Sequence, residues 1–151
     1  MQSSTIANEI KYYHILKSIF IKGNYTLLTD QEINDAKIGF KYEHPSDILH
    51  EHEDCIRMAY EWFDAQTTIK SKPKHNRALK HIIEKWAGRY ISQSDVEIAA
   101  YLHPKITGKY PNFNLSAKFT RPLDSRLSGI SEAFTQDYRD RFDPKAYSKD
   151  E

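Results

Sequence analysis

Apolar residues recur at steps of three and four along most of the chain, which is the spacing of one face of an α-helix. One such stripe runs from Ile6 to Phe20, and two stronger ones predict a long helix over 46–68 and a second helix over 76–90. Trp62 and Trp86 lie on these stronger stripes. We therefore expect the last two helices to pack as a hairpin and to bury both indoles.

Capping boxes mark two further helix starts, because a Ser or Thr is followed three residues later by Glu. Thr29 with Glu32 and Ser94 with Glu97 have this spacing. These pairs predict a short helix over 30–38, which ends at Gly39, and another that starts near Ser94 and ends before residues 103–104 (His-Pro). A last apolar stripe predicts a helix over 131–141.

A chain of 151 residues normally forms one domain with its own core. We therefore expect a mostly α-helical protein, folded as a compact bundle of five to seven helices in a single domain over residues 1–142. A polar tail follows over 143–151. It begins at Asp143–Pro144, and we expect it to fray.

Residues 76–121 have the order helix, short extended corner, helix, loop and helix start. This layout resembles the first three helices of a helix-turn-helix or winged-helix DNA-binding domain, with residues 89–92 in the place of the short strand. The resemblance implies that residues 113–121 match the recognition helix. The connection from Leu102 to Asn112 is longer than the turn of about three or four residues in that family, and no alternating hairpin pattern follows Pro122.

Cations, aromatic rings and an amide gather between residues 103 and 121. Lys and Arg contact phosphates, flat rings stack on bases, and Asn reads base edges. The candidate nucleic-acid-binding residues are Lys105, Lys109, Tyr110, Phe113, Asn114, Ser116, Lys118 and Arg121. The sequence thus favours a small nucleic-acid-associated or regulatory protein with DNA or RNA as its partner. In the other interpretation of this segment, its aromatic residues fill the core and its lysines solvate a loop.

The charge pattern keeps a second function open. The net charge of +1 gives no global attraction for a polyanion. Acidic residues concentrate over 47–64 and basic residues over 70–89, so the two expected helices either neutralise each other or form an interface. The alternative function is a non-catalytic protein-interaction module or inhibitor that acts through a helical surface on a protein partner or in a homodimer.

Catalytic signatures are weak in this sequence. His50 and Asp54 stand one helical turn apart at the start of the expected helix 46–68 and could meet a cation, but a helix N-terminus favours acidic residues in any case. The sequence has no HExxH motif, glycine-rich phosphate loop or GxSxG motif. We expect no catalytic residue, no metal and no cofactor, and we favour a binding protein over an enzyme.

Cys55 is the single cysteine, so it forms no internal disulfide. The first residues carry neither the pattern of a signal peptide nor a long apolar run. We therefore expect a cytoplasmic protein with no membrane partner.

Overall fold

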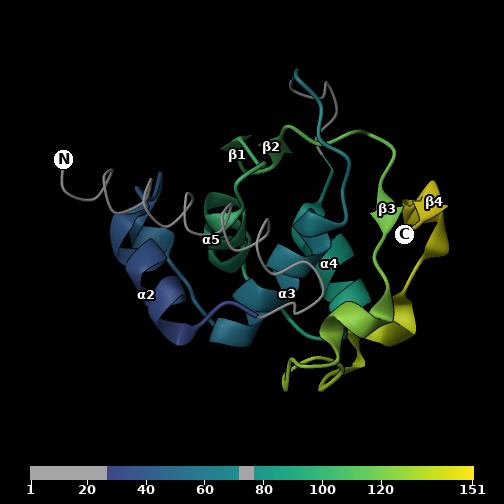
Figure 1. The fold of residues 1–151 in the computed structure, drawn as a ribbon. Helices are drawn as coiled ribbons and strands as arrows, with labels where there is room; N and C mark the ends of the chain where they lie inside the picture. Colours follow the sequence, from purple (N-terminus) through teal and green to yellow (C-terminus); the bar gives the residue numbers. More distant parts are fainter. Residues whose placement is uncertain (1–26, 72–76) are drawn as a thin grey trace.

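A computed structural model describes residues 27–71 and 77–151 (Figure 1). The α-helices in these ranges are α2 (Asp30–Gly39), α3 (Glu53–Asp64), α4 (Leu79–Ala87) and α5 (Gln93–Leu102). Short 3-10 helices lie at η1 (Pro45–Asp47), η2 (Asp124–Leu127), η3 (Asp137–Arg141) and η4 (Pro144–Ala146). The strands are β1 (Gly108–Lys109), β2 (Asn112–Phe113), β3 (Thr120–Arg121) and β4 (Lys149–Asp150). The apolar stripe from Ile6 to Phe20 lies outside the described residues.

The prediction of a mostly α-helical bundle of five to seven helices is wrong. The described ranges hold four α-helices, and after residue 103 the chain forms short strands, 3-10 helices and loops. β1 and β2 form an antiparallel hairpin, whereas β3 and β4 pair in parallel. The fold is therefore a mixed helix and sheet fold. Within the described part of the chain, every helix is too short or too polar to cross a membrane.

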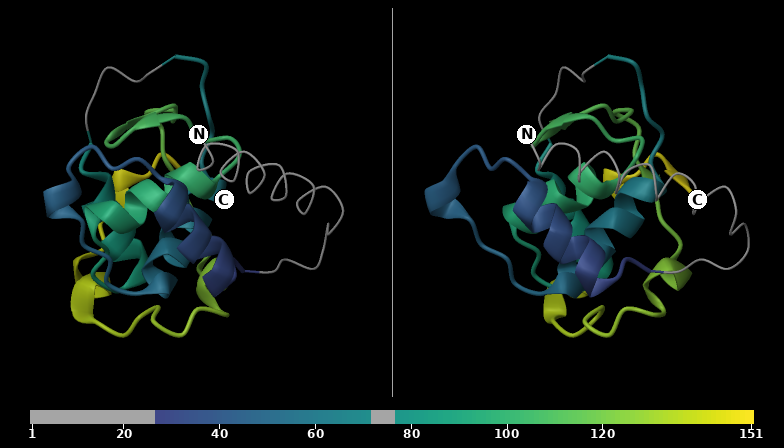
Figure 2. Two further views of the ribbon diagram at one scale, coloured as in Figure 1. Left: turned by 90° about the vertical axis from the view of Figure 1, so that its left-hand side faces the viewer. Right: turned by 60° about the vertical axis from the view of Figure 1, so that its left-hand side comes forward.

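Helix α3 lies at the centre of the core. It packs most extensively against α5 and also contacts α2 and α4, with α2 on one side of this group and the C-terminal segment on the opposite side (Figures 1 and 2). Trp62 on α3 and Trp86 on α4 are both completely buried, which confirms their predicted place in the core.

Local capping explains where two helices begin. The capping box of Thr29 and Glu32 starts α2, as the sequence predicts. In α5 the capping residue is Ser92, whose hydroxyl accepts a hydrogen bond from the Asp95 backbone N–H. The capping box therefore lies two residues before the predicted pair of Ser94 and Glu97. The end of α5 at Leu102 agrees with the prediction.

Helix α3 is shorter than the helix expected over 46–68. His52 caps its start, because Nδ1 of the imidazole accepts a hydrogen bond from the Asp54 backbone N–H. Residues 48–52 run instead along the start of α5. The Leu49 N–H donates to Ser94 Oγ at 3.1 Å and the Glu51 N–H to Asp95 at 3.4 Å. These donors are thus bonded outside the segment and do not form helical hydrogen bonds.

Helix α4 occupies the middle of the predicted range 76–90. Gly88 ends it in the left-handed conformation, with φ of 71°. A Cβ atom at this position would lie 2.9 Å from the Phe134 Cα. Glycine therefore satisfies both the backbone angle and the close approach of the segment around Phe134.

The prediction of a third helix over 113–121 is wrong. Buried Phe113 and Leu115 alternate with half-buried Asn114 and Ser116, which is the period of an extended chain. The backbone of this segment bonds to distant residues: the Ile69 N–H donates to the Asn114 carbonyl, and the Ser116 N–H donates to the carbonyl of residue 67. The helix-turn-helix resemblance therefore fails at its recognition element.

The C-terminal part also departs from the expected helix over 131–141 and the expected frayed tail. Within 131–141 the structure has only η3, and Phe134 before it has a positive φ of 62°. Strand β4 then pairs with β3, and the Glu151 N–H donates to the Arg121 carbonyl at 3.0 Å. Residues 143–151 are thus held against the rest of the fold.

Candidate functional site

The predicted site residues occupy the β1–β2 hairpin and the loop that follows it. Lys105, Lys109 and Lys118 are exposed, as phosphate contacts require. Phe113 is buried and packs edge-to-face on Phe63, with ring centroids 5.4 Å apart. Phe113 is therefore a core residue, which the alternative interpretation of this segment anticipated.

The side-chain amide of Asn114 is hydrogen-bonded at both ends within the protein. Its Oδ1 accepts a hydrogen bond from the Thr107 N–H at 2.8 Å, and its Nδ2 donates to the Lys105 carbonyl at 2.9 Å. The amide thus closes the base of the hairpin. Because both ends of the amide are bonded within the protein, Asn114 has little capacity to read a base edge.

The other three predicted residues have separate surroundings. Tyr110 lies at the hairpin turn, and its hydroxyl accepts a hydrogen bond from the Lys80 N–H at 3.5 Å. Ser116 Oγ accepts from the Lys118 N–H. The Arg121 guanidinium lies 4.5 Å from the ring centroid of Phe142. Arg121 is therefore stacked within the C-terminal sheet region.

A pocket of about 500 Å³ lies between the segment after α2, helix α5 and the β1–β2 hairpin. Its lining contains five aromatic side chains, two lysines and two glutamates. The lining residues are Phe40, Lys41, Tyr42, Glu43, Glu97, Ala100, Tyr101, Gly108, Lys109, Tyr110 and Phe113. Three of the predicted residues, Lys109, Tyr110 and Phe113, thus meet in one concave site, whereas Lys105, Asn114, Ser116, Lys118 and Arg121 do not line it.

The rings of this aromatic pocket support one another. Phe40 packs edge-to-face on Tyr42, with centroids 4.9 Å apart, and on Tyr101 at 5.2 Å. Tyr110 packs in the same manner on Phe113 at 6.2 Å. Burial raises the pKa values of Tyr101 and Tyr110. At neutral pH these phenols are therefore uncharged ring surfaces with a polar tip.

A hydrogen-bonded chain leads from the pocket into the protein. The Tyr42 hydroxyl lies 2.7 Å from His50 Nε2, and His50 Nδ1 lies 2.8 Å from Asp95 Oδ1. Burial, followed by the charges of Glu97 and Asp95, raises the pKa of Tyr42 to about 12. Tyr42 thus remains protonated at neutral pH. Because Asp95 faces Nδ1 of His50, the tautomer with the proton on Nδ1 lets the Tyr42 hydroxyl donate to Nε2.

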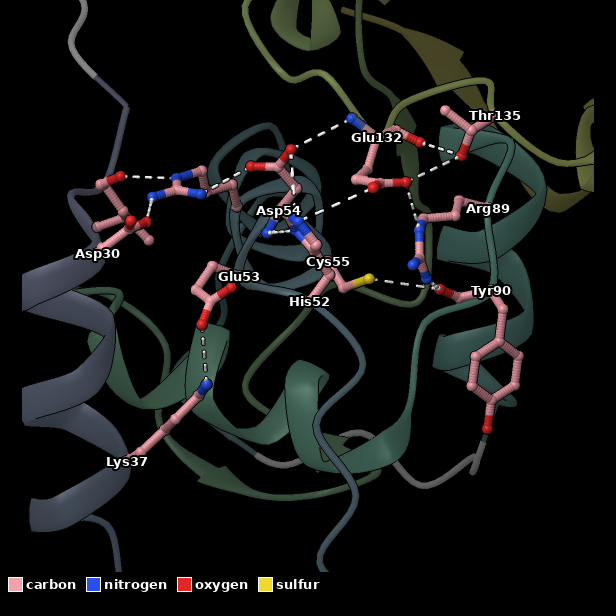
Figure 3. Close-up of polar contacts among 12 residues, drawn as sticks. Asp30, Lys37, His52, Glu53, Asp54, Cys55, Arg89, Tyr90, Glu132 and Thr135 are labelled. Carbon is pink, nitrogen blue, oxygen red and sulfur yellow. Dashed lines mark hydrogen bonds and ion pairs between the residues drawn. The ribbon is translucent and has the colours of Figure 1, made fainter.

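The acidic cluster at the start of α3 has structural partners (Figure 3). Asp54 accepts hydrogen bonds from Arg57 at 2.7 Å and from the Glu132 N–H at 3.2 Å. Glu132 in turn pairs with Arg89 at 3.1 Å. His50 points to Asp95 instead, so His50 and Asp54 have different partners. In residues 27–71 and 77–151, no three His, Cys, Asp or Glu side chains are arranged to hold a metal ion.

Cys55 in this cluster is an unreactive thiol. It is completely buried, and its Sγ lies 3.4 Å from the Tyr90 carbonyl oxygen, to which it donates (Figure 3). Burial and then Asp95 raise its pKa to about 12. The thiolate, which is the nucleophilic form, is therefore scarce at neutral pH.

Sequence patterns did not reveal most of the pocket. Phe40, Tyr42, Glu97 and Tyr101 come from two segments far apart in sequence, and the hairpin supplies the rest. The alternation of rings and charges over residues 40–43 is the one local signal that could have indicated it. No protein-family model, curated protein or solved structure matches this chain.

Proposed function

We propose that the protein binds single-stranded nucleic acid, with an unpaired base held in the aromatic pocket. The observation that supports this most strongly is the convergence of five rings on one pocket whose lining also contains Lys41 and Lys109. Aromatic side chains stack on unpaired bases, and lysines contact the flanking phosphates. A volume of about 500 Å³ is in the range of small-ligand sites.

The charges in the pocket add a preference among bases. Glu43 and Glu97 balance the two lysines, so the pocket has no net charge. A carboxylate accepts hydrogen bonds from an exocyclic amino group. Cytosine, adenine and guanine carry such a group, whereas uracil and thymine lack it. The proposal therefore includes a preference for amino-bearing bases.

A single strand fits this site better than a duplex. The described residues present no recognition helix at 113–121, and Asn114 is bonded within the hairpin. A base in a duplex has both faces stacked and cannot enter a pocket unless it is extruded. An unpaired base already exposes both faces, so it can enter the pocket without the free energy needed to extrude a base from a duplex.

Fluorescence anisotropy with labelled single-stranded DNA, single-stranded RNA and duplex DNA tests the proposal. We expect salt-sensitive binding to at least one single strand and weaker binding to the duplex. Lys109→Ala should reduce the salt slope by about 0.7. Lys118→Ala is the matched control, because Lys118 is equally a surface lysine but does not line the pocket.

Equal effects of the two lysine variants would place the nucleic acid elsewhere. If the wild-type protein at micromolar concentration shows no salt-sensitive binding to single-stranded DNA, single-stranded RNA or duplex DNA, the proposal fails. The second candidate is then a protein-interaction module. Its support is the set of exposed apolar side chains Ile38, Ile48 and Leu49, which are 77%, 41% and 49% exposed.

A further inference from the structure

We propose that Tyr42 is a catalytic nucleophile toward a phosphodiester in the aromatic pocket, that His50 is its general base, and that Asp95 is the residue that positions His50. The inference rests on the proposed function for its substrate class, since nucleic acids are phosphodiesters.

The geometry is that of a nucleophile, a base and an orienting acid. His50 Nε2 lies 2.7 Å from the Tyr42 oxygen, and His50 Nδ1 lies 2.8 Å from Asp95. These distances fall within the range of about 2.6–3.2 Å for such pairs. Asp95 is completely buried and also accepts from the backbone N–H groups of Glu51 and Ser92. Its carboxylate is therefore fixed, and it holds the imidazole with Nδ1–H toward itself.

In this tautomer the Nε2 lone pair of His50 faces the Tyr42 hydroxyl and can take its proton. The raised pKa of Tyr42, about 12, means that the phenol does not ionise unaided at neutral pH. A base in contact with the hydroxyl is thus required for Tyr42 to react, and His50 is in that position. The His50 side chain is 15% exposed, so little water competes for Nε2.

Tyr42 connects the hydrogen-bonded residues His50 and Asp95 to the pocket, because Tyr42 lines the pocket and the other two residues do not. Lys41 and Lys109 provide cations for a phosphoryl group, whereas Glu43 and Glu97 repel excess negative charge. The balance favours a phosphodiester with one negative charge over a phosphomonoester with two.

The reaction is a transesterification. The Tyr42 oxygen attacks phosphorus, and its proton passes to His50 Nε2. The bond from phosphorus to the leaving oxygen breaks on the side of phosphorus opposite Tyr42, and therefore away from His50. That oxygen takes its proton from water, and His50 passes its proton to water. The products are a phosphotyrosyl diester and an alcohol, so atoms and charge balance without a metal or an oxidant.

Tyr110 is an internal control for this inference. It lines the same pocket, but its hydroxyl accepts a hydrogen bond from the Lys80 backbone N–H. A reaction that depends only on pocket binding would modify Tyr110 as well as Tyr42. A reaction that depends on His50 would select Tyr42.

The test uses bis(4-nitrophenyl) phosphate with the full chain. We expect release of about one equivalent of 4-nitrophenol per chain and an adduct on Tyr42 by peptide mass spectrometry, with slower reaction of the monoester 4-nitrophenyl phosphate. Tyr42→Phe should abolish the adduct, and Tyr138→Phe, which changes a tyrosine outside the pocket lining, should retain it. His50→Gln, verified as folded by circular dichroism, should slow the reaction at least about 100-fold. Added imidazole should restore part of the rate in His50→Ala.

Absence of an adduct on Tyr42 in the folded wild-type protein overturns the inference, even if His50 variants do not fold. An equal rate in folded His50→Gln overturns the role of His50. The oligonucleotide measurement separates this failure from that of the proposed function. Binding without an adduct contradicts only the nucleophile, whereas an adduct without oligonucleotide binding supports the nucleophile and contradicts the proposed ligand.

Discussion

The indole Nε1 of Trp62 donates a hydrogen bond of 3.0 Å to the hydroxyl oxygen of Tyr147, 85 residues later in the chain. Trp62 is completely buried on α3, and Tyr147 follows η4 near the C-terminus. A buried indole N–H without an acceptor is costly, so this bond fastens the C-terminal segment to the core. The segment thus contributes to stability although its sequence is polar.

Tyr147→Phe should lower the free energy of unfolding by about 1–3 kcal/mol, because the Trp62 N–H loses its acceptor. Urea denaturation measures the change. Tyr138→Phe is the control, since Tyr138 is half-buried in ring contacts with Tyr90 and Arg141. Equal small changes in both variants would show that the Trp62 bond adds nothing.

Gly88→Ala should destabilise the protein by about 1–3 kcal/mol, because the left-handed backbone strains an alanine and the new Cβ meets the Phe134 backbone. Gly129→Ala is the matched control. Gly129 has no positive φ, and its added Cβ would meet only the end of the Leu27 side chain, at 3.2 Å. Thermal unfolding of the two variants distinguishes them, and similar melting temperatures would refute the role given to Gly88.

Asp64 should make stability fall in acid. Burial would raise its pKa, but hydrogen bonds from His103 and Arg126 outweigh burial and lower the pKa to about 2, below the ordinary value of 3.8. The unfolded chain therefore takes up the proton first. The contribution of Asp64 is fully present above the ordinary pKa and is lost as the pH falls toward 2.

Asp64→Asn should flatten the pH dependence of the urea midpoint over this acidic window. Asp137→Asn serves as the control, since Asp137 is 77% exposed and pairs with Arg141 at 3.5 Å. If the urea midpoint of Asp64→Asn falls in acid as steeply as that of the wild-type protein, other carboxylates cause the loss of stability in acid.

Glu97→Gln should reduce the preference for amino-bearing bases. Competition between cytidine and uridine oligonucleotides measures the ratio of affinities, which we expect to fall about fivefold, equivalent to about 1 kcal/mol. Glu53→Gln is a suitable control, since Glu53 pairs with Lys37 outside the pocket lining. A ratio that does not change in Glu97→Gln would remove the carboxylate from base selection.

Features that depend on neighbouring residues were predictable from the sequence. The capping box of Thr29 and Glu32 and the stop before His103 act within one helical turn, so their patterns are visible locally. The burial of Trp62 and Trp86 follows from the apolar period of their helices. These features do not require knowledge of the tertiary structure.

Features that depend on long-range pairing were not predictable. Residues 114–116, in the middle of the expected helix, are not helical because their backbone bonds to residues 67–69, including the bridge from Thr68 to Leu115. His50 and Asp95 stand 45 residues apart in sequence and meet only in the fold. For the same reason the pocket lining could be predicted only from its hairpin part.

Base binding in the aromatic pocket is tested most directly by photo-crosslinking of a single-stranded oligonucleotide that carries 5-iodocytidine, followed by mass-spectrometric mapping of the adduct. We expect crosslinks to Phe40, Tyr42, Tyr101 or Tyr110, because these rings line the pocket. The crosslinks should be lost in competition with unlabelled cytidine oligonucleotide. Reproducible crosslinks only to rings outside the pocket, such as Phe134 or Phe142, would contradict base binding in the pocket.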